Sequence, residues 1–578
     1  MDAMPSSAPS SKPQLVSRVV GALPLVNPIL EALELDSLLR EYVPADARSK
    51  LPPATGLGLL LRNLLISREP LYSLAEWSAR YEEGLLGLPG GGGAALNDDR
   101  LGRCLDKLFL ADRAALMTAV VVRAVRAFGV TLEELHNDST TVTFKGDYAQ
   151  ARGQVKKGRP TARITHGHNK DHRPDLKQLL FNLTTSADGT VPVWCAVEHG
   201  NTPDDTTHIG NWSALCRLAG RADFLYVADS KLCTRDNMQH IDRHNGRFVT
   251  VLPRTRGEVA WFAGWKKKHP PQWTELLRQP NSRGKEGPDE VYRGVESPMS
   301  SAEGFRILWV HSSQKQERDE LTRQRRLARA TDELTALATR LNGPKARKRE
   351  VESVRRAAQA ILSATHTAHL LTFAVEVREE DTFKQLRPGR PNQDTAYVRV
   401  PKQKLHLHFS TNPEAVKAEA EMDGIFPLIT NDRKLSAVQL LGAYKHQPAL
   451  ERRHEQLKTV LEVMPMSLKN STRIEALLFL YFLALLVHAL LERQVRLRMK
   501  AEHLTELPLY PEGRASTRPN ADRVLRLFED LRCHRLVTDS GALTHTFTDE
   551  LNERQTLLLR LLGIPPSSYF SDVLSPRP

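Results

Sequence analysis

The chain has 578 residues, which is long enough for three or four domains of ordinary size. Its 81 Lys and Arg residues outnumber its 68 Asp and Glu residues, and the formal net charge is +13. We therefore expect a polyanionic partner, either nucleic acid or an anionic membrane. The five cysteines lie far apart without a CxxC pair, which excludes a disulfide framework and a cysteine-rich zinc site and favours a reducing cytoplasm.

The N-terminus and one apolar segment bear on targeting. Residues 1–15 are rich in Ser and Pro, lack the features of a signal peptide, and are expected to form a disordered tail. Residues 474–492 are almost long enough to cross a membrane, but Glu475 and His488 interrupt them. We therefore predict a helix buried inside a large domain, and no membrane association.

Residues 16–130 have a helical pattern. Three apolar-rich runs carry Arg on their remaining face, and a Gly-rich break from Leu88 separates the second run from the third. The pattern predicts an N-terminal all-helical domain. Two functions stay open for it, DNA binding and a packing or dimerisation role, because no helix-turn-helix spacing is present.

Two stretches with strand character each carry a single acid. Residues 132–144 and 223–234 are rich in apolar and β-branched residues, and small hydroxyl residues follow the acid in each. The acids are Asp138 and Asp229. This pattern is typical of a strand that bears a carboxylate at or near its end.

The elements of residues 131–254 follow a definite order. After the strand with Asp138 come two strands joined by a hairpin turn at Asp188-Gly189, then a helix that opens with capping residues, then the strand with Asp229 and one more strand. This is the order of a ribonuclease H-like core, in which the first and fourth strands are neighbours. We therefore expect an α/β fold whose catalytic core brings the two Asp residues together.

An α+β insertion at residues 255–422 is expected to interrupt this core. A long charged run at residues 317–363 predicts a basic helical hairpin that turns at residues 342–344, Asn-Gly-Pro. Its basic face either follows DNA phosphates or is only solvated. Residues 423–510 return to the core, and residues 511–578 are expected to be a C-terminal helical tail.

A third acid comes from the second part of the core. From Ala449 the sequence is strongly helix-forming, and Pro448 can occupy the first turn. Glu451 and Lys458 are seven residues apart and should project from one face of the helix, while Leu450 and Leu457 anchor the neighbouring stripe in a core. An ordinary exposed charged helix is the alternative for this stretch taken alone.

A basic loop lies between the first two strands. It contains three histidines beside Lys170 and Arg173, and we interpret these residues as phosphate contacts rather than as a zinc site. The histidines are His166, His168 and His172.

These motifs together resemble bacterial insertion-sequence transposases of the DDE class, in the subgroup with a Tyr-Arg-Glu-Lys signature. The signature is Tyr, two residues, Arg, three residues, Glu, six residues, Lys. Tyr444, Glu451 and Lys458 match it at that spacing, and Gln447 stands in the Arg position. The segments HNDST, GHNKDHRPDLKQ, HGNTPDD, YVADS and DGIFPLITND resemble the family's core, so the likeness covers roughly residues 130–500.

The resemblance implies a metal-dependent enzyme that acts on double-stranded DNA. Asp138, Asp229 and Glu451 would be catalytic and would hold two Mg²⁺ ions, for which Mn²⁺ can substitute. Tyr444, Gln447, Lys458, Lys170 and Arg173 would contact the DNA. The DNA would be the element's terminal inverted repeats and the target, bound by a homodimer in the bacterial cytoplasm at the nucleoid.

Two other functions stay open. One is a ribonuclease H-like nuclease that cuts DNA without strand transfer. The other is a DNA-binding protein whose catalytic site has decayed, which Gln447 in the Arg position would favour. If cleavage passes through a hairpin intermediate, Trp309 in the insertion is the residue expected to stack on a flipped base.

Overall fold

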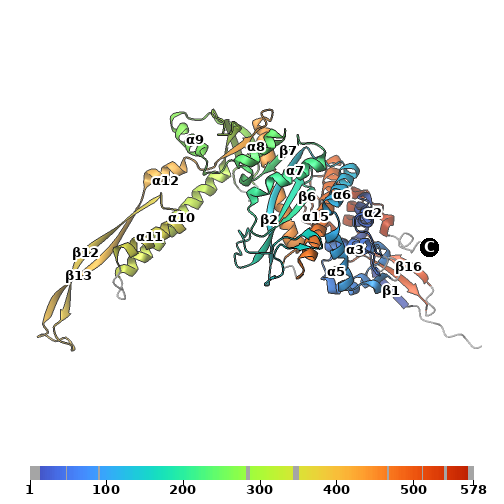
Figure 1. Cartoon of the computed structure of the whole chain (residues 1–578), viewed down its shortest axis with the longest axis horizontal. Coiled ribbons are helices and arrows are strands. Elements are labelled where there is room, and N and C mark those ends of the chain that lie inside the picture. The colour runs from blue at the N-terminus through green and yellow to red at the C-terminus, as the bar shows by residue number, and fades with distance from the viewer. Residues whose placement is uncertain are drawn as a thin grey trace, which may run out of the picture. The chain divides into compact units, whose positions relative to one another are not determined.

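The computed structural model describes residues 14–46, 49–88, 92–281, 287–342, 350–464, 468–510, 512–538 and 543–569. The chain divides into two compact units, the first formed by Met1–Thr250 with Gly442–Pro578 and the second by Val251–Leu441. Both units mix helices and strands (Figure 1), as the α/β expectation requires. Most of the tail expected at residues 1–15 lies outside the described residues, and its last two residues begin a strand.

The N-terminal region of the first unit is mainly helical, as predicted. The helices are α1 (Leu23–Ala32), α2 (Leu35–Tyr42), α3 (Pro53–Ile66), α4 (Leu74–Arg80), α5 (Asp98–Leu110) and α6 (Arg113–Phe128). Side chains cap two of them, because Asn97 accepts a hydrogen bond from the Arg100 N–H and Asp112 accepts one from the Ala115 N–H. The all-helical prediction is wrong at the start, where β1 (Gln14–Val19) pairs with β15 (Arg532–Val537).

Five strands form the sheet of the first unit. They are β2 (Glu134–Phe144), β5 (Lys177–Ser186), β6 (Pro192–Glu198), β7 (Leu225–Ala228) and β8 (Arg247–Val251). Their order is β6-β5-β2-β7-β8. The strand β2 pairs antiparallel with β5 and parallel with β7, and β7 pairs parallel with β8. The predicted adjacency of the first and fourth strands is therefore confirmed.

The connections in this sheet follow from local sequence. The turn between β5 and β6 falls at Asp188-Gly189, as predicted, and Gly189 has a φ of +81°, which glycine adopts without strain. The helix α7 (His208–Ala219) follows β6, also as predicted. The helix α8 (Arg235–Arg243) was missed because its sequence is almost entirely polar. A short hairpin, β3 (Val155–Lys156) with β4 (Arg159–Pro160), lies in the loop after β2.

One long helix, α15 (Ser471–Ala501), forms the centre of the first unit. It contacts α3, α5, β6 and α17 (Glu553–Leu562), so it joins the N-terminal helices to the sheet and to the C-terminus. Among the described residues it is the helix long and apolar enough to cross a membrane, but 94% of its most apolar window is buried inside the protein. The prediction of a buried helix is confirmed.

The C-terminal region is not purely helical. Besides α16 (Ala521–Arg526) and α17 it contains β15 and β16 (Leu543–Thr548), and the order β1-β15-β16 makes a small three-stranded sheet. The prediction of a helical tail is wrong here. The partner of β15 lies more than 500 residues earlier in the chain, so no local pattern indicates the pairing.

The second unit contains four sheet strands in the order β14-β11-β10-β9. These are β9 (Thr274–Gln279), β10 (Glu290–Glu296), β11 (Arg306–Ser312) and β14 (Ile425–Thr430), and neighbouring strands are antiparallel. Three helices accompany them, α9 (Gly257–Lys268), α12 (Pro413–Ala420) and α13 (Ala437–Tyr444), of which α13 runs past the end of the unit.

The predicted helical pair is present in the second unit as α10 (Ser313–Asn342) and α11 (Val351–Ala364). The turn expected between them lies mostly outside the described residues. The pair packs against a two-stranded ribbon, β12 (Leu371–Gln385) with β13 (Tyr397–Thr411), and the ribbon continues past the helices (Figure 1). The shared core consists of Ala330, Leu334, Leu337, Ala358, Leu362, Leu371 and Leu407.

The expectation for Trp309 is wrong. Its side chain is fully buried on β11, and its ring stacks on Phe262 of α9 with the centroids 3.8 Å apart. A side chain held in the core in this way is not available to stack on a base.

Candidate active site

The first two predicted acids lie side by side. In the parallel pairing of β2 with β7, Asn137 is opposite Ala228; the next residue is Asp138 on β2 and Asp229 directly after the end of β7. Neighbouring strands are about 4.8 Å apart, so the register alone makes the two residues neighbours. The Asp229 carboxylate also accepts a hydrogen bond from the Lys231 N–H, 3.0 Å away, which caps the short helix η5 (Ser230–Leu232) and fixes the side chain.

Burial and mutual repulsion shape the electrostatics of this pair. Burial raises the pKa of Asp138 above its usual range, although the nearby Lys170 opposes this effect. Burial likewise raises the pKa of Asp229, and the negative charge of Asp138 adds to the rise. Two carboxylates with raised pKa values at one place are a cluster that gains from an added cation.

The ammonium group of Lys170 supplies such a charge. Its Nζ lies 3.5 Å from Asp138 Oδ1 and 3.1 Å from Asp204 Oδ2, and it donates to the Ser139 carbonyl oxygen at 2.6 Å. Burial disfavours the charged form, but Asp138, Asp204 and Asp229 outweigh burial and raise the pKa of Lys170. The predicted DNA contact is thus engaged with acids of the site.

The sequence analysis missed Asp204. It begins the short helix η4 (Asp204–Thr206), and its carboxylate is the nearest acid partner of Lys170. Its segment, Pro203-Asp204-Asp205, was interpreted as capping sequence before a helix and as part of the HGNTPDD motif, without a role for either acid. The sequence did contain one indication of a further role: a helix needs one N-cap residue, and here two acids follow each other.

The third acid lies on α14 (Gln447–Glu455), which begins with Pro448 in its first turn as predicted. Leu450 and Leu457 are fully buried, also as predicted. Arg453 fixes the helix to the β5–β6 turn, because its Nε donates to the Thr190 carbonyl oxygen at 3.0 Å. The same guanidinium pairs with Glu492 of α15 at 2.8 Å, so two buried contacts hold α14 on the sheet.

Glu451 is exposed on this helix, and Tyr444 links it electrostatically to the Asp pair. Burial raises the pKa of Tyr444 to about 12, and the charges of Asp229 and Glu451 both add to the rise. The phenol of Tyr444 therefore lies in the field of both acids. The structure brings Asp138 and Asp229 together, and the charge of Glu451 raises the pKa of Tyr444 in the same direction as the charge of Asp229 does.

The helix changes character after Glu455. Residues Gln456–Val460 form a π-helical turn, η6, so the uninterrupted α-helix behind the seven-residue spacing is wrong. The wider turn keeps Gln456 buried, where its amide donates to the His488 ring at 3.0 Å. Lys458 lies within the turn, and its Nζ is 2.6 Å from Asp171 Oδ1 in the basic loop. Its side chain is therefore tied to that loop.

His454 is the second residue that the sequence analysis missed. Its side chain is 8% exposed, and its Nε2 lies 3.6 Å from Asp138 Oδ2. Neither ring nitrogen has a hydrogen-bond partner within the described residues. Burial lowers the pKa of His454 to about 3, with Lys170 and Lys458 adding to the effect, so the ring is neutral at neutral pH. Because His454 lies in a run of charged residues, the sequence alone suggested an exposed side chain.

The other two predicted DNA contacts differ in exposure. Gln447 begins α14, and its buried Oε1 has no hydrogen-bond partner among the residues described. Arg173 is exposed and pairs with Asp175 at 2.7 Å. Their interaction with DNA stays a prediction.

The fit of this site to a metal ion is partial. Carboxylate oxygens are the ligands that Mg²⁺ prefers, and Asp138 and Asp229 supply them at one place. Across the described ranges, however, no group of three or more His, Cys, Asp or Glu side chains is arranged to hold a metal ion. The ammonium of Lys170 lies against Asp138 and Asp204, and Glu451 is exposed.

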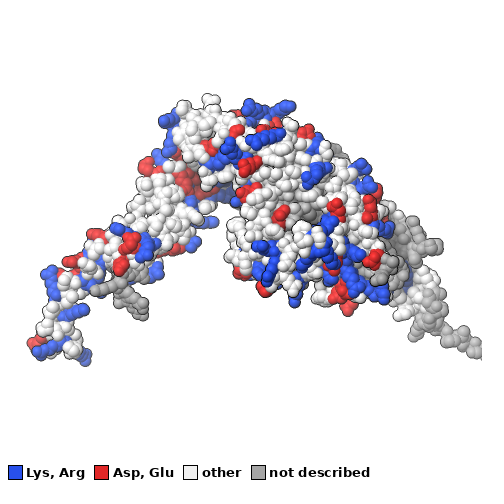
Figure 2. Space-filling model, viewed as in Figure 1, with Lys and Arg blue, Asp and Glu red and all other residues white. Residues whose placement is uncertain are grey.

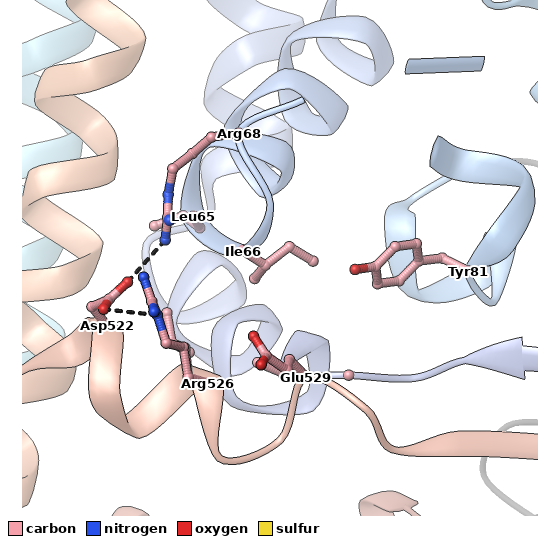
Figure 3. A pocket seen from close by; sticks show the side chains of 10 residues that line it. Leu65, Ile66, Arg68, Tyr81, Asp522, Arg526 and Glu529 are labelled. Carbon is pink, nitrogen blue, oxygen red and sulfur yellow. Dashed lines mark hydrogen bonds and ion pairs between the residues drawn. The ribbon is translucent and has the colours of Figure 1, made fainter. Parts of the chain in front are cut away.

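A small pocket elsewhere in the first unit contains none of these acids (Figure 3). In it Asp522 pairs with Arg68 and with Arg526, each at 3.0 Å. The paired charges join the end of α3 to α16, so the pocket is a packing feature between the N-terminal and C-terminal regions. Its lining residues are Gly21, Ala22, Leu65, Ile66, Arg68, Tyr81, Asp522, Leu525, Arg526 and Glu529.

Part of the chain matches a known protein family. Residues 15–122 match a family described as a domain of unknown function, DUF4277. The matched region runs from β1 into α6 and so covers the N-terminal helices. No curated protein matches the chain.

Proposed function

We propose that this protein is a DDE-class transposase that cuts the ends of an insertion sequence and transfers the cut strands into target DNA. The observation that carries the proposal is the register that puts Asp138 beside Asp229 on neighbouring parallel strands. The spacing of Tyr444, Glu451 and Lys458 in the sequence supports it, and the helix α14 that carries Glu451 packs against β2. The net charge of +13 suits the polyanionic substrate.

The topology of the first unit also supports the proposal. The order β6-β5-β2-β7-β8, with β2 antiparallel to β5 and parallel to β7, is the order expected of a ribonuclease H-like core. In such a core the acids sit where Asp138 and Asp229 sit here. The second unit interrupts the first between Asp229 and Glu451, as the sequence resemblance implies.

The proposed roles follow from the positions of the side chains. Asp138, Asp229 and Glu451 would be the carboxylates that hold Mg²⁺, and the metal would supply Lewis-acid chemistry for the displacement at phosphorus. Tyr444, whose raised pKa keeps its hydroxyl protonated, would donate a hydrogen bond to a phosphate oxygen. Water would be the first nucleophile, and the freed 3′-hydroxyl of the element would be the second.

The proposal is tested with the full chain and DNA that carries the inverted repeats flanking its coding region. We expect Glu451→Ala to abolish Mg²⁺-dependent cleavage while DNA binding survives. Glu455→Ala is the matched control, because it removes an exposed acid one turn away and should leave cleavage intact. Cleavage by purified Glu451→Ala would overturn the assignment, and precut ends that fail to join target DNA would indicate a nuclease.

A binding protein without catalysis is the second candidate. Two observations favour it: Gln447 stands in the Arg position, and the Lys170 ammonium already lies against the acids. Calorimetric titration with Mg²⁺ separates the two. An active site should bind Mg²⁺ more tightly than a variant with Asp138, Asp229 and Glu451 all changed to Ala, whereas a decayed site should not differ from it.

A further inference from the structure

The β12–β13 ribbon of the second unit changes character halfway along its length. Near the helices, one face is apolar, and Phe373, Val375 and Phe409 pack against the core that α10 and α11 share with the ribbon. The pairing continues without a break to Gln385 opposite Tyr397. From Val377 to Gln385 the nine paired residues extend about 30 Å, and among the described residues the helices α10 and α11 end before this part of the ribbon (Figure 1).

The outer part of the ribbon exposes large apolar side chains. Phe383 is 67% exposed, Leu386 60% and Tyr397 51%. Phe383 is opposite Arg399 and Tyr397 is opposite Gln385, so the two aromatic rings are diagonal neighbours on one face. An uncovered two-stranded ribbon is only marginally stable in water, and exposed aromatic side chains on it indicate a surface that another molecule covers.

Charge is separated along the same ribbon. Near the helices the acids are paired, with Glu376 bonded to Arg378 at 2.9 Å and Glu380 bonded to Lys404. Residues 382–402, which we call the ribbon tip, contain five Lys or Arg side chains and a single Asp. Figure 2 shows Lys and Arg side chains at this free end.

Most cations of the ribbon tip have no acidic partner. Arg399 pairs with Asp381 at 2.7 Å, but in the part of the chain that the structure describes no ion pair engages the other four. All four are exposed, and they are Lys384, Arg387, Arg390 and Lys402. Unpaired cations beside exposed aromatic rings match the surface of a nucleic acid duplex, which offers phosphates at the groove edges and apolar base surface between them.

We propose that the ribbon tip is a DNA-binding arm that enters a groove of duplex DNA. A two-stranded ribbon is one of the elements that the major groove, about 12 Å wide, admits. Lys384, Arg387, Arg390 and Lys402 contact phosphates on the two sides of the groove. Phe383 and Tyr397 contact the base edges. The proposal takes DNA as partner from the proposed function but does not depend on cleavage.

The test measures DNA binding by the full chain in EDTA, where cleavage cannot contribute. The probe is a labelled 30-base-pair duplex, titrated at several salt concentrations. A tip variant, K384Q/R387Q/R390Q/K402Q, should bind about tenfold or more weakly, and its slope of log K against log salt should be smaller by about 3.6, which is about 0.9 for each of the four phosphate contacts removed. The matched control, R318Q/R325Q/R340Q/R356Q, removes four exposed Arg residues from α10 and α11 and should change affinity less than about threefold.

A second variant separates apolar contact from charge. F383A/Y397A should weaken binding while the salt slope stays unchanged, because apolar contacts release no counterions. Replacing residues 379–403 with Asn-Gly closes the ribbon at the Arg378–Lys404 pair with a hairpin turn, and this shortened chain should bind as weakly as the tip variant.

Three outcomes would overturn the proposal. One is wild-type affinity in the tip variant, and another is an equal loss in the helix control, which would indicate diffuse charge. The third is a tip variant that changes the oligomeric state in sedimentation experiments but not the affinity for DNA, which would assign the ribbon to a second copy of the chain. Loss of cleavage in Glu451→Ala with normal tip-dependent binding would leave both proposals intact, since the two readouts are separate.

Discussion

The acid cluster of the first unit and the ribbon tip of the second unit both contain lysine, but the lysines differ in whether an acid neutralises them. Lys170 is largely buried and contacts two carboxylates and a carbonyl oxygen. Lys384, at the ribbon tip, is exposed and engages no acid within the described chain. A sequence-based count of basic residues treats the two as equal. The difference teaches that net charge predicts the class of partner, whereas pairing decides which cations are available to bind it.

The largest effect is expected when a buried cation that is paired with an acid is removed. Arg453→Met should lower the free energy of unfolding by about 3 kcal/mol, because the buried carboxylate of Glu492 loses its nearer guanidinium at 2.8 Å and keeps only Arg496, at 3.3 Å, as a charged partner. The control is Arg452→Met at the neighbouring exposed position, which should cost less than about 0.5 kcal/mol. Urea unfolding at pH 7 measures both. Equal losses of stability in the two variants would mean that the buried ion pair contributes no more to the free energy of unfolding than an exposed arginine does.

The next effect is pH-dependent and concerns a buried ion pair in the second unit. Hydrogen bonding from Arg256 lowers the pKa of Glu258 to about 2, from about 4.5 in the unfolded chain. Because the folded pKa is depressed, this stabilisation is complete above pH 4.5 and is lost as the pH falls towards 2. It amounts to at most about 3 kcal/mol.

Comparison with Glu258→Gln measures this contribution. The stability difference between wild type and variant should be constant above pH 5 and should shrink to near zero by pH 2. Glu275→Gln, at an exposed acid paired with Arg278, should show little difference at any pH. A difference for Glu258→Gln that persists at pH 2 would contradict the assignment.

A smaller effect addresses the role of Lys170. Lys170→Gln should lower the free energy of unfolding in EDTA by about 1–3 kcal/mol, because the acids lose the cation that neutralises them. Thermal unfolding with and without Mg²⁺ checks this. Mg²⁺ should raise the melting temperature of the variant more than that of the wild type. Lys177→Gln, which removes a cation paired with the exposed Asp147, should not change the response to Mg²⁺.

The smallest effect on stability is expected at an exposed pair. Arg173→Gln removes the partner of Asp175, and both groups are solvent-exposed, so the free energy of unfolding should not change measurably. If Arg173 contacts DNA as predicted, the affinity for duplex DNA should nevertheless fall and the salt slope should drop by about 1. A change in stability without a change in affinity for DNA would mean that Arg173 stabilises the fold and does not contact DNA.

Much of the fold was predictable because local pattern and local pairing agree. The strands β2, β5, β6, β7 and β8 were each indicated by apolar and β-branched runs, and Asp188-Gly189 marked the hairpin between two of them. The small β1-β15-β16 sheet was not, because its strands come from opposite ends of the chain. The helix α8 was missed because its polar sequence hides the burial of Met238 and Ile241.

The candidate site divides in the same way. Asp138, Asp229 and Glu451 were identifiable because an acid among strand-forming residues and a spaced signature are local features of the sequence, although Asp138 lies in the middle of β2 and only Asp229 lies at a strand end. Asp204 and His454 were not, since their importance comes from contacts with Lys170 and Asp138 that only the folded chain creates. The π-turn at Gln456–Val460 was not predicted either, because the residue spacing there is compatible with a regular α-helix.

The sequence by itself determined the mixed α/β class, the net positive charge, the order of the first unit's strands and the acids on or directly after two of them. Those properties follow from side-chain periodicity and composition, which each segment carries whatever it packs against. Only the tertiary structure decided which cations are paired, which aromatic rings are buried and where the ribbon continues beyond its helices. Such properties depend on what lies opposite each side chain, and the opposite residue comes from a distant part of the chain.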